Sequence, residues 1–487
     1  MERAVTPPVT PARTGRDIAG QLTLRSANLA LGVVTTVVLV RALGDTGFGQ
    51  WATVLAVMGL AGSFGMIGLN NVTVERAAAE PHRAPAWVGA LVTLRALLSP
   101  PLTVASLAMC LALADTSGMR ITAAVVHTAL LTSALASARI VFQLRVRNAV
   151  VSAVELGGGV AWLAAVTLVA LLGGSLVAIA IAFAAVQHAT NLLLLWLAFR
   201  THPIRVRGGR SLWRPLLRLG LPVGLASLVA LGYARVGQVF VFELAGAREA
   251  GLYGAARRLY EPLGFLPGSI MTTLFPLLVA ARANGTAQIG RLFNTAIDYL
   301  LLFSLPALTI SLAGPEEIAV TLFGAEFARA GEALPVLMAA FVLISLGHLS
   351  GYLIITYGLQ RRFVLVTLLG LGFTVMANLV LVPAHGFIAA VWVTLATELL
   401  VVGFSMTMVC RRMGVAPKGV RVGRIAASAV AVGALAWVLR HAGAPVVVWA
   451  GVAGAAYPLV LLGFGGIRTE DVRALLRRRR VAVGDAP

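Results

Sequence analysis

Runs of mainly apolar residues, separated by short polar connections, follow one another along almost the whole chain. A run of about 20 such residues crosses roughly 30 Å of hydrocarbon as a helix that rises about 1.5 Å per residue. The pattern therefore predicts an all-α polytopic membrane protein with about 14 transmembrane helices. These helices are expected at residues 18–41, 48–70, 87–113, 121–142, 150–172, 176–198, 217–243, 252–280, 293–313, 333–357, 364–382, 387–410, 422–439 and 446–465.

Charge alternates between successive connections. The N-terminal tail and every second connection after it carry 27 basic residues, whereas the connections between them carry five. Because lysine and arginine accumulate on the cytoplasmic side of membrane proteins, both termini are predicted to lie in the cytoplasm. The net charge of +20 then reflects an arginine-rich cytoplasmic face and needs no nucleic-acid partner. Only 12% of the residues are charged, which agrees with a membrane protein.

The connections also suggest how the chain is organised. Residues 1–17 lack a signal-peptide core and are expected to form a cytoplasmic arm. The longest inner connection, within residues 199–216, is basic and contains Gly208, Gly209 and Pro215, so it is the predicted linker between two lobes. The N-lobe (18–198) would hold helices 1–6 and the C-lobe (217–410) helices 7–12. Residues 411–465 would add helices 13 and 14, and residues 466–487 a basic cytoplasmic tail.

The two lobes resemble each other in sequence. The segment VRALGDTGFGQWATVLAV (40–57) is similar to VFELAGAREAGLYGAARRL (241–259), with Gly47 aligned to Gly251. Six helices per repeat predict two pseudo-symmetric bundles related by an axis along the membrane normal. Helices 2 and 8 correspond in this repeat, and both are interrupted by glycine or proline, which in transporters points to a substrate site. The glycines of helix 2 are equally typical of close helix packing.

Several charged residues fall inside the predicted helices, where each costs about 2.5–3.5 kcal/mol at the helix centre. They are therefore expected to face a cavity, and the forked guanidinium groups suit a phosphate-bearing substrate. The candidate substrate-binding residues are Arg25, Arg95, Arg235, Arg257 and Arg258. Pairing within a helix is an alternative for Arg257 and Arg258 with Glu261, and Arg139 and Arg218 are expected to extend toward the cytoplasmic boundary.

Four acids inside the predicted helices are candidates for binding a coupling Na⁺ or H⁺. They are Glu155, Glu261, Asp298 and Glu398. Each could instead be a structural partner of a neighbouring arginine or hydroxyl group. No other cofactor and no bound metal are expected, because the two cysteines fall in separate apolar segments.

Four segments, in this order, are similar to the polysaccharide transport family, the oligosaccharide (O-antigen, Wzx-type) flippases of the multidrug/oligosaccharidyl-lipid/polysaccharide (MOP) superfamily. They are RALGDTGFGQW (41–51), GLYGAARRLYEPLGFLPGSIMTTLFPLL (251–278), LFGAEFARAGEALPVL (322–337) with TYGLQRR (356–362), and NLVLVPAHGFIAAVWVTLATELL (378–400). The resemblance implies two six-helix bundles around a central cavity that opens alternately to each side. The implied activity is outward translocation of an undecaprenyl-diphosphate-linked glycan across the bacterial plasma membrane.

Other functions stay open from the sequence. A lipid II flippase is the nearest alternative, another MOP exporter is possible, and a polytopic glycan polymerase or ligase is the alternative among enzymes. The outer connections are too short for a catalytic domain, and no GxxxxGK[ST] phosphate-binding loop is present, so we expect a transporter that is not an enzyme. Expected partners are the lipid-linked substrate, membrane lipids and other glycan-assembly membrane proteins, with the chain itself a monomer.

Overall fold

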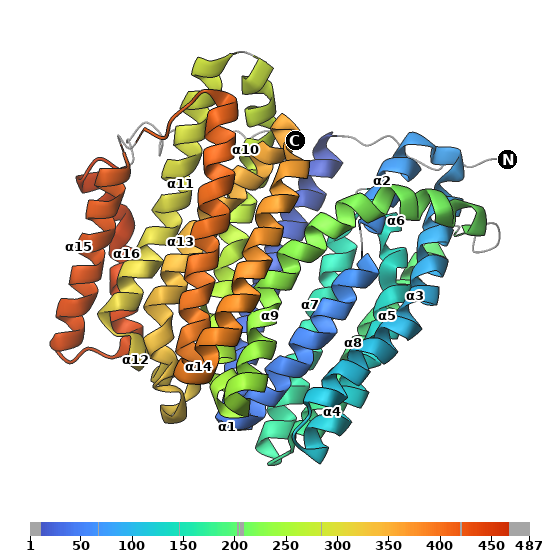
Figure 1. Ribbon diagram of the computed structural model, residues 1–487, viewed down its shortest axis with the longest axis horizontal. Coiled ribbons are helices and arrows are strands. Elements are labelled where there is room, and N and C mark those ends of the chain that lie inside the picture. Colours follow the sequence, from blue (N-terminus) through green and yellow to red (C-terminus); the bar gives the residue numbers. More distant parts are fainter. Residues whose placement is uncertain are drawn as a thin grey trace. The chain divides into compact units, whose positions relative to one another are not determined.

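The computed structural model describes residues 11–66, 68–145, 147–201, 204, 209–283, 285–418 and 421–466. Every regular element within these ranges is a helix (Figure 1). Apolar segments of this length form helices in a membrane because a helix satisfies all its backbone hydrogen bonds internally. The expected all-α fold class is confirmed.

The chain forms two compact units. The first comprises Met1–Gly254 and Thr374–Phe387, and the second comprises Ala255–Phe373 and Ile388–Pro487. These boundaries differ from the predicted linker at 199–216, part of which (202–203 and 205–208) lies outside the described residues. Residues 1–10 of the predicted arm and 467–487 of the predicted tail also lie outside them. The lobes defined by the repeat therefore stay a prediction.

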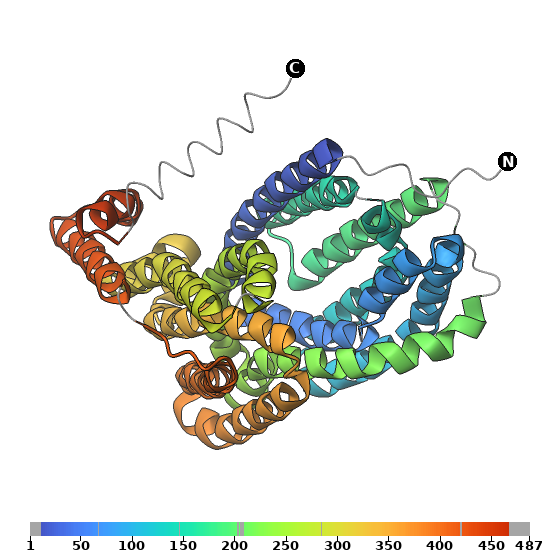
Figure 2. The same cartoon turned by 90° about the horizontal axis from the view of Figure 1, so that it is seen from above.

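In the first unit, the early part of α1 packs along α7, and α3 packs against α5 and the short helices beside it (Figure 2). Trp87, Leu91 and Phe142 are among the side chains that fill the core beside α2 and α3. The helices of this unit are α1 (Pro11–Met66), α2 (Leu69–Ala79), η1 (Pro81–Arg83), α3 (Ala84–Leu113), α4 (Ser117–His127), α5 (Ala129–Leu135), η2 (Ala136–Arg139), α6 (Ile140–Leu144), α7 (Asn148–Leu171), α8 (Leu176–Thr201), η3 (Gly209–Leu212), most of α9 (Trp213–Tyr260) and part of α14 (Gln360–Met413).

In the second unit, α11 packs against both α13 and α15, and α15 lies beside α16 (Figure 1). Phe293, Leu349 and Trp449 belong to one continuous apolar core that joins these helices. The helices of this unit are η4 (Glu261–Gly264), α10 (Phe265–Ala283), α11 (Thr286–Ala313), α12 (Pro315–Phe323), η5 (Ala325–Phe327), α13 (Ala330–Tyr357), the rest of α14, α15 (Val422–His441) and α16 (Val446–Gly463).

Within the described ranges, 11 helices are long and apolar enough to cross a membrane. Three of them contain a glycine with a positive φ that interrupts the helix: Gly44 (φ 65°), Gly246 (φ 89°) and Gly386 (φ 61°). Only glycine adopts such dihedrals without a steric penalty, so each of these helices turns a corner there. When each of these three is counted as two segments, the described ranges contain fourteen candidate membrane helices, the number predicted from the sequence.

The corners at Gly44 and Gly246 show how the repeats align. A Cβ atom on Gly49 would lie 1.8 Å from the carbonyl oxygen of Ala247, and one on Gly251 would lie 1.8 Å from that of Asp45. The contact is reciprocal, and the pairs 44/246, 45/247 and 49/251 are all 202 residues apart. The predicted alignment of Gly47 with Gly251 is therefore wrong by two residues, because it matched the outer turns by composition and not by the glycine that makes the corner.

Two predicted helices differ in the structure. Helix α1 begins at Pro11, within the predicted arm, and not at residue 18. The single helix expected over 121–142 is interrupted instead, as α4, α5, η2 and α6. Hydroxyl groups accompany these interruptions: Thr128 Oγ1 donates to the carbonyl of Val125 at 2.6 Å, and Ser137 Oγ to that of Ala134 at 2.7 Å. Such side chains compete for backbone carbonyls and bend helices.

Candidate substrate site

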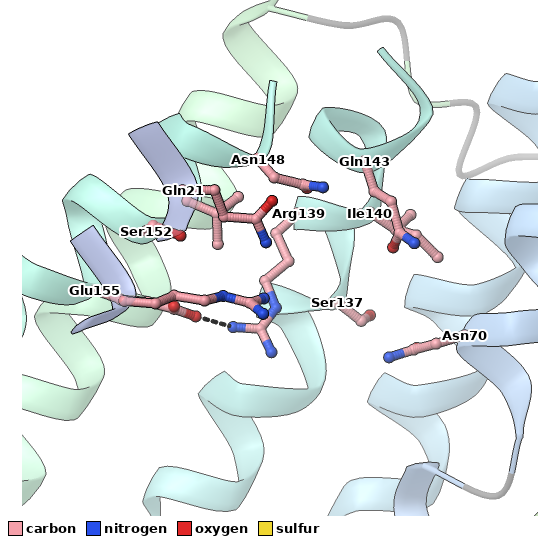
Figure 3. A pocket seen from close by; sticks show the side chains of 11 residues that line it. Gln21, Asn70, Ser137, Arg139, Ile140, Gln143, Asn148, Ser152 and Glu155 are labelled. Atoms are coloured by element: carbon pink, nitrogen blue, oxygen red, sulfur yellow. Dashed lines mark hydrogen bonds and ion pairs between the residues drawn. The ribbon is translucent and has the colours of Figure 1, made fainter. Parts of the chain in front are cut away.

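A cavity of about 190 Å³ lies within the first unit (Figure 3). Its walls come from α1, α2, η2, α6 and α7. The lining residues are Gln21, Arg25, Asn70, Ser137, Arg139, Ile140, Gln143, Asn148, Val151, Ser152 and Glu155. Most of these side chains are polar, although they belong to helices that are otherwise apolar. We call this space the N-terminal cavity.

Helical periodicity places the residues of two of the walls. Asn148, Val151, Ser152 and Glu155 are spaced by three or four residues, so they lie on one face of α7. Gln21 and Arg25 have the same spacing on α1. Gly20 of α1 approaches Ala149 of α7, so the two helices meet next to the cavity.

The remaining walls depend on helix interruptions. Arg139 is the last residue of the 3₁₀ segment η2, where the hydroxyl-rich run of helix 4 has departed from α geometry. Asn70 is the second residue of α2, and this helix begins directly after Gly68, which adopts a left-handed conformation (φ 62°). In Figure 3 the side chain of Asn70 extends toward the cavity from the side opposite Glu155. The predicted interruption of helix 2 is confirmed and borders the cavity.

The cavity carries an excess of positive charge. Arg139 Nη1 donates to Glu155 Oε1 at 2.8 Å (dashed in Figure 3), and both side chains are more than a third exposed. With its amide oxygen turned toward Arg25, Gln21 accepts hydrogen bonds from Nη2 at 3.0 Å and from Nε at 3.3 Å. Within the described part of the chain, no carboxylate pairs with Arg25. An anion would therefore find one uncompensated guanidinium and a second one held in place by Glu155.

Arg95 lies close to this cavity but does not line it. It is on α3, only 6% exposed, and near enough to Arg139 for the two charges to repel. Its Nε atom is buried and has no hydrogen-bond partner among the described residues. A buried cation without a matching acid is destabilising, so its presence calls for a reason other than packing.

Arg235 occupies a different place in the first unit. A Cβ atom on Gly59 would lie 2.7 Å from Arg235 Nη1, so the absence of a side chain at Gly59 makes room for the guanidinium group. Gly59 thus does more than allow two helices to approach. The structure does not bring Arg235 into the N-terminal cavity.

Arg257 and Arg258 belong to the second unit and share one acid. Arg257 donates to Glu261 Oε1 from Nη2 at 2.9 Å and from Nε at 3.1 Å, and Arg258 Nη1 lies 3.7 Å from Glu261 Oε2. These are the intrahelical pairs that the sequence allowed as the alternative. Glu261 begins η4, where Pro262 interrupts helix 8 as predicted. One carboxylate still faces two guanidinium groups, so their role in substrate binding stays a prediction.

The four acids proposed for ion coupling are dispersed. Glu155 is paired with Arg139, and Glu261 with the two arginines of helix 8. Asp298 lines a different cavity in the second unit together with Arg421, whose positive charge attracts its carboxylate. Glu398 is 7% exposed within α14. Ion coupling by any of them stays a prediction.

Sequence reasoning missed Arg139 as a cavity residue. Arg139 lies close to the end of the helix predicted at 121–142, so its side chain was expected to reach the cytoplasmic boundary. That expectation assumed a regular helix. The threonines and serines between residues 128 and 137 were the signal that this helix is not regular. The carboxamides Gln21, Asn70, Gln143 and Asn148 were also missed, because a neutral polar side chain in an apolar helix gives little warning.

A family model described as "Polysaccharide biosynthesis protein" matches residues 38–332. No curated protein matches the chain. Solved structures match over most of it, at identities low enough that they establish the fold alone. A lipid II flippase MurJ in an inward closed conformation has a TM-score of 0.72 at 12% identity, covering 93% of this chain and 99% of its own.

Two transporters of the MOP superfamily are also similar in fold. An inward-facing multidrug resistance transporter of the MATE family has a TM-score of 0.64 at 16% identity, covering 81% of this chain and 98% of its own. A MOP transporter from Pyrococcus furiosus has a TM-score of 0.57 at 15% identity, covering 83% of this chain and 95% of its own. The MOP fold predicted from the sequence is confirmed.

Proposed function

Because the chain belongs to the polysaccharide biosynthesis protein family, we propose that it is a flippase for undecaprenyl-diphosphate-linked oligosaccharide or polysaccharide repeat units. The unit would move from the cytoplasmic to the outer leaflet of the plasma membrane by alternating access, with both termini in the cytoplasm. The observation that carries the proposal is the N-terminal cavity, where Arg25 has no carboxylate partner among the described residues and Arg139 lies in the facing wall.

The charge of the cavity suits a diphosphate. Two guanidinium groups offer forked donors that match phosphate oxygens, and they stay ionised when partly removed from water. The cavity is lined by the first residues of α7. These follow directly after Arg145 and Arg147, which belong to a connection that the basic-residue count assigns to the cytoplasm. This is the side on which a lipid-linked precursor would be loaded.

The neutral polar residues of the cavity suit a sugar. Carboxamides both donate and accept hydrogen bonds, as sugar hydroxyl groups do, and Gln143 and Asn148 line the same cavity as Arg25 and Arg139 (Figure 3). A volume of about 190 Å³ is smaller than the roughly 300–1,000 Å³ of drug-sized sites. The cavity would therefore hold only the part of the head nearest the lipid, and the rest would lie outside it.

We favour a lipid-linked substrate over a small drug because the lipid II flippase structure matches more of this chain than the multidrug transporter structure does. The lipid II flippase structure covers 93% of this chain, whereas the multidrug transporter covers 81% while itself being almost fully matched. The lipid II flippase remains the second candidate for the same reason. Na⁺ or H⁺ coupling is the proposed energy source, and other glycan-assembly membrane proteins are the proposed partners of a monomeric chain.

The test is export in a bacterial strain that lacks its own copy of this flippase. We expect Arg25→Ala and Arg139→Ala each to reduce surface glycan about tenfold or more, because each removes charge-assisted hydrogen bonds worth roughly 1.5–3 kcal/mol. Arg218→Ala is the matched control, since Arg218 is an exposed arginine that does not line the cavity.

Membrane abundance of every variant is measured alongside export. Two stable cavity variants that export at the rate of the control would rule out the cationic-cavity mechanism. Export of a peptidoglycan precursor in place of the surface glycan would assign the protein to the second candidate.

A further inference from the structure

A second cavity lies within the second unit and is lined by none of the candidate substrate-binding residues. It has a volume of about 810 Å³ and is lined by α11 and by the connection from α14 to α15. We call it the α11 groove. Its polar lining includes Thr286, Arg291, Asn294, Asp298, Lys418 and Arg421.

The groove follows one face of α11. Thr286, Gly290, Asn294 and Asp298 succeed one another at intervals of four residues, so they form a single stripe. At 1.5 Å per residue, this stripe extends about 18 Å from the start of the helix. The groove therefore runs from the end of the helix into the part that crosses the membrane.

Two residues that follow α14, Val415 and Lys418, contact α11 beside the groove. The backbone N–H of Lys418 donates to Asn294 Oδ1 at 2.7 Å. Gly290 leaves space for Val415, whose Cγ1 would lie 3.3 Å from a Cβ atom at that position. These contacts place Lys418 at the groove that Arg291 of α11 also lines.

The charges of the groove favour an anion. Arg291, Lys418 and Arg421 contribute three positive charges, and Asp298 is the one acid among its lining residues, which leaves a net charge of +2. The first turn of α11 adds backbone N–H groups, because no side chain caps it at Gly285. A coupling cation at Asp298 would meet this positive field, so an anion is the better ligand.

We propose that the α11 groove binds the phosphate group of an anionic phospholipid at the cytoplasmic leaflet. The three cations come from α11, from the connection and from the residue that precedes α15, so one phosphate would link all three. Its effect would be to hold the helix pair α15 and α16 against α11, with which α15 already packs (Figure 1). A groove that extends into the membrane-crossing part of α11 fits a lipid headgroup better than a free ion.

The test uses the full-length protein in nanodiscs of phosphatidylcholine, with and without phosphatidylglycerol. We expect phosphatidylglycerol to raise the unfolding temperature of the wild type. In Arg291→Ala/Lys418→Ala, the affinity for phosphatidylglycerol should fall about tenfold or more, and the rise should be lost. Arg424→Ala is the matched control, because Arg424 is an exposed arginine on α15 that does not line the groove.

Three results would overturn the proposal. The first is an equal effect of phosphatidylglycerol on the double variant and the control, and the second is no effect on the wild type. The third is full stabilisation by inorganic phosphate in phosphatidylcholine nanodiscs, because the ligand of the groove would then be a free anion and not a lipid. Should the double variant fail to accumulate, Arg291→Gln and Arg291→Lys are compared, and only the lysine variant should retain the response.

Discussion

The reciprocal contact between Gly49 and Gly251 predicts that neither position tolerates a side chain. In Gly49→Ala, the new methyl group would lie 1.8 Å from the carbonyl oxygen of Ala247, 2.8 Å from its carbonyl carbon and 2.8 Å from the amide nitrogen of Gly251. All three atoms are backbone, so no side-chain rotation relieves the overlap. Helices α1 and α9 must separate at this corner.

The size of the effect follows from the distances. Real Cβ atoms essentially never approach another heavy atom closer than 3.0 Å, so the backbone segments must move apart by at least 1.2 Å, the difference between 3.0 and 1.8 Å. Overpacking of a tight contact costs about 1–3 kcal/mol and more where backbone must shift, so we expect a loss at or above the upper end of that range. The nearby ion pair of Arg248 with Asp45 (2.7 Å) is exposed on the arginine side and would offset little of it.

The assay is thermal unfolding of purified protein, with membrane abundance as a second measure. Gly47→Ala is the matched control, because its Cβ atom would meet only side-chain atoms of Leu43, on the other side of the corner, at 3.3 Å and beyond. The double variant of Gly49 and Gly251 should be less destabilised than the sum of the single variants, since one separation relieves both overlaps. Unfolding of Gly49→Ala at the temperature of the control would refute the close backbone contact.

Three further predictions concern charged residues. Gly59→Val should displace the guanidinium group of Arg235 and reduce export, with unfolding close to wild type because a long side chain can move, and a thermal scan beside the export assay checks both. Arg95→Met should leave stability unchanged or raise it by up to about 4 kcal/mol while reducing export, since an apolar side chain replaces a buried cation that has no carboxylate partner among the described residues; lost stability with normal export would contradict this. Glu317→Gln should lower the unfolding free energy by about 1 kcal/mol or less, because the ion pair with Arg440 is more than a third exposed on both sides, and a larger loss in chemical unfolding would disagree.

The fold was largely predictable because the membrane imposes one strong constraint. Twenty apolar residues in succession have to form a helix where no water satisfies the backbone, so both the fold class and the number of crossings followed from hydropathy. The corners were harder to place. Composition aligned Gly47 with Gly251, but only the positive φ of Gly44 and Gly246 identified the residues that turn the chain.

The candidate site was less predictable because it depends on departures from regular helices. Arg25 was found from its cost inside an apolar helix, and the structure places it in the cavity wall. Arg139 entered the cavity through the 3₁₀ segment η2, which hydropathy does not reveal. Arg95 was expected to face a cavity as Arg25 does, yet it is buried on α3 and does not line the N-terminal cavity. The sequence predicts how far along a helix a residue lies. The direction in which its side chain points depends on the local backbone geometry, which the structure provides.

The two predicted repeats are alike at the corners made by Gly44 and Gly246 and unlike where the N-terminal cavity lies. Helix 10, the counterpart of helix 4, is the uninterrupted α13, whose 28 residues contain no break of the kind seen at Thr128 and Ser137. Arg139 reaches the N-terminal cavity because it ends a 3₁₀ segment, and α13 has no such segment. We therefore expect no equivalent cavity in the second repeat. If the proposed flippase binds its diphosphate at the N-terminal cavity, only the first repeat provides this binding site, and the asymmetry comes from the interrupted helix 4. Thr128→Ala and Ser137→Ala remove the hydroxyl groups that accompany the interruptions, so together they should weaken export without removing any charged residue.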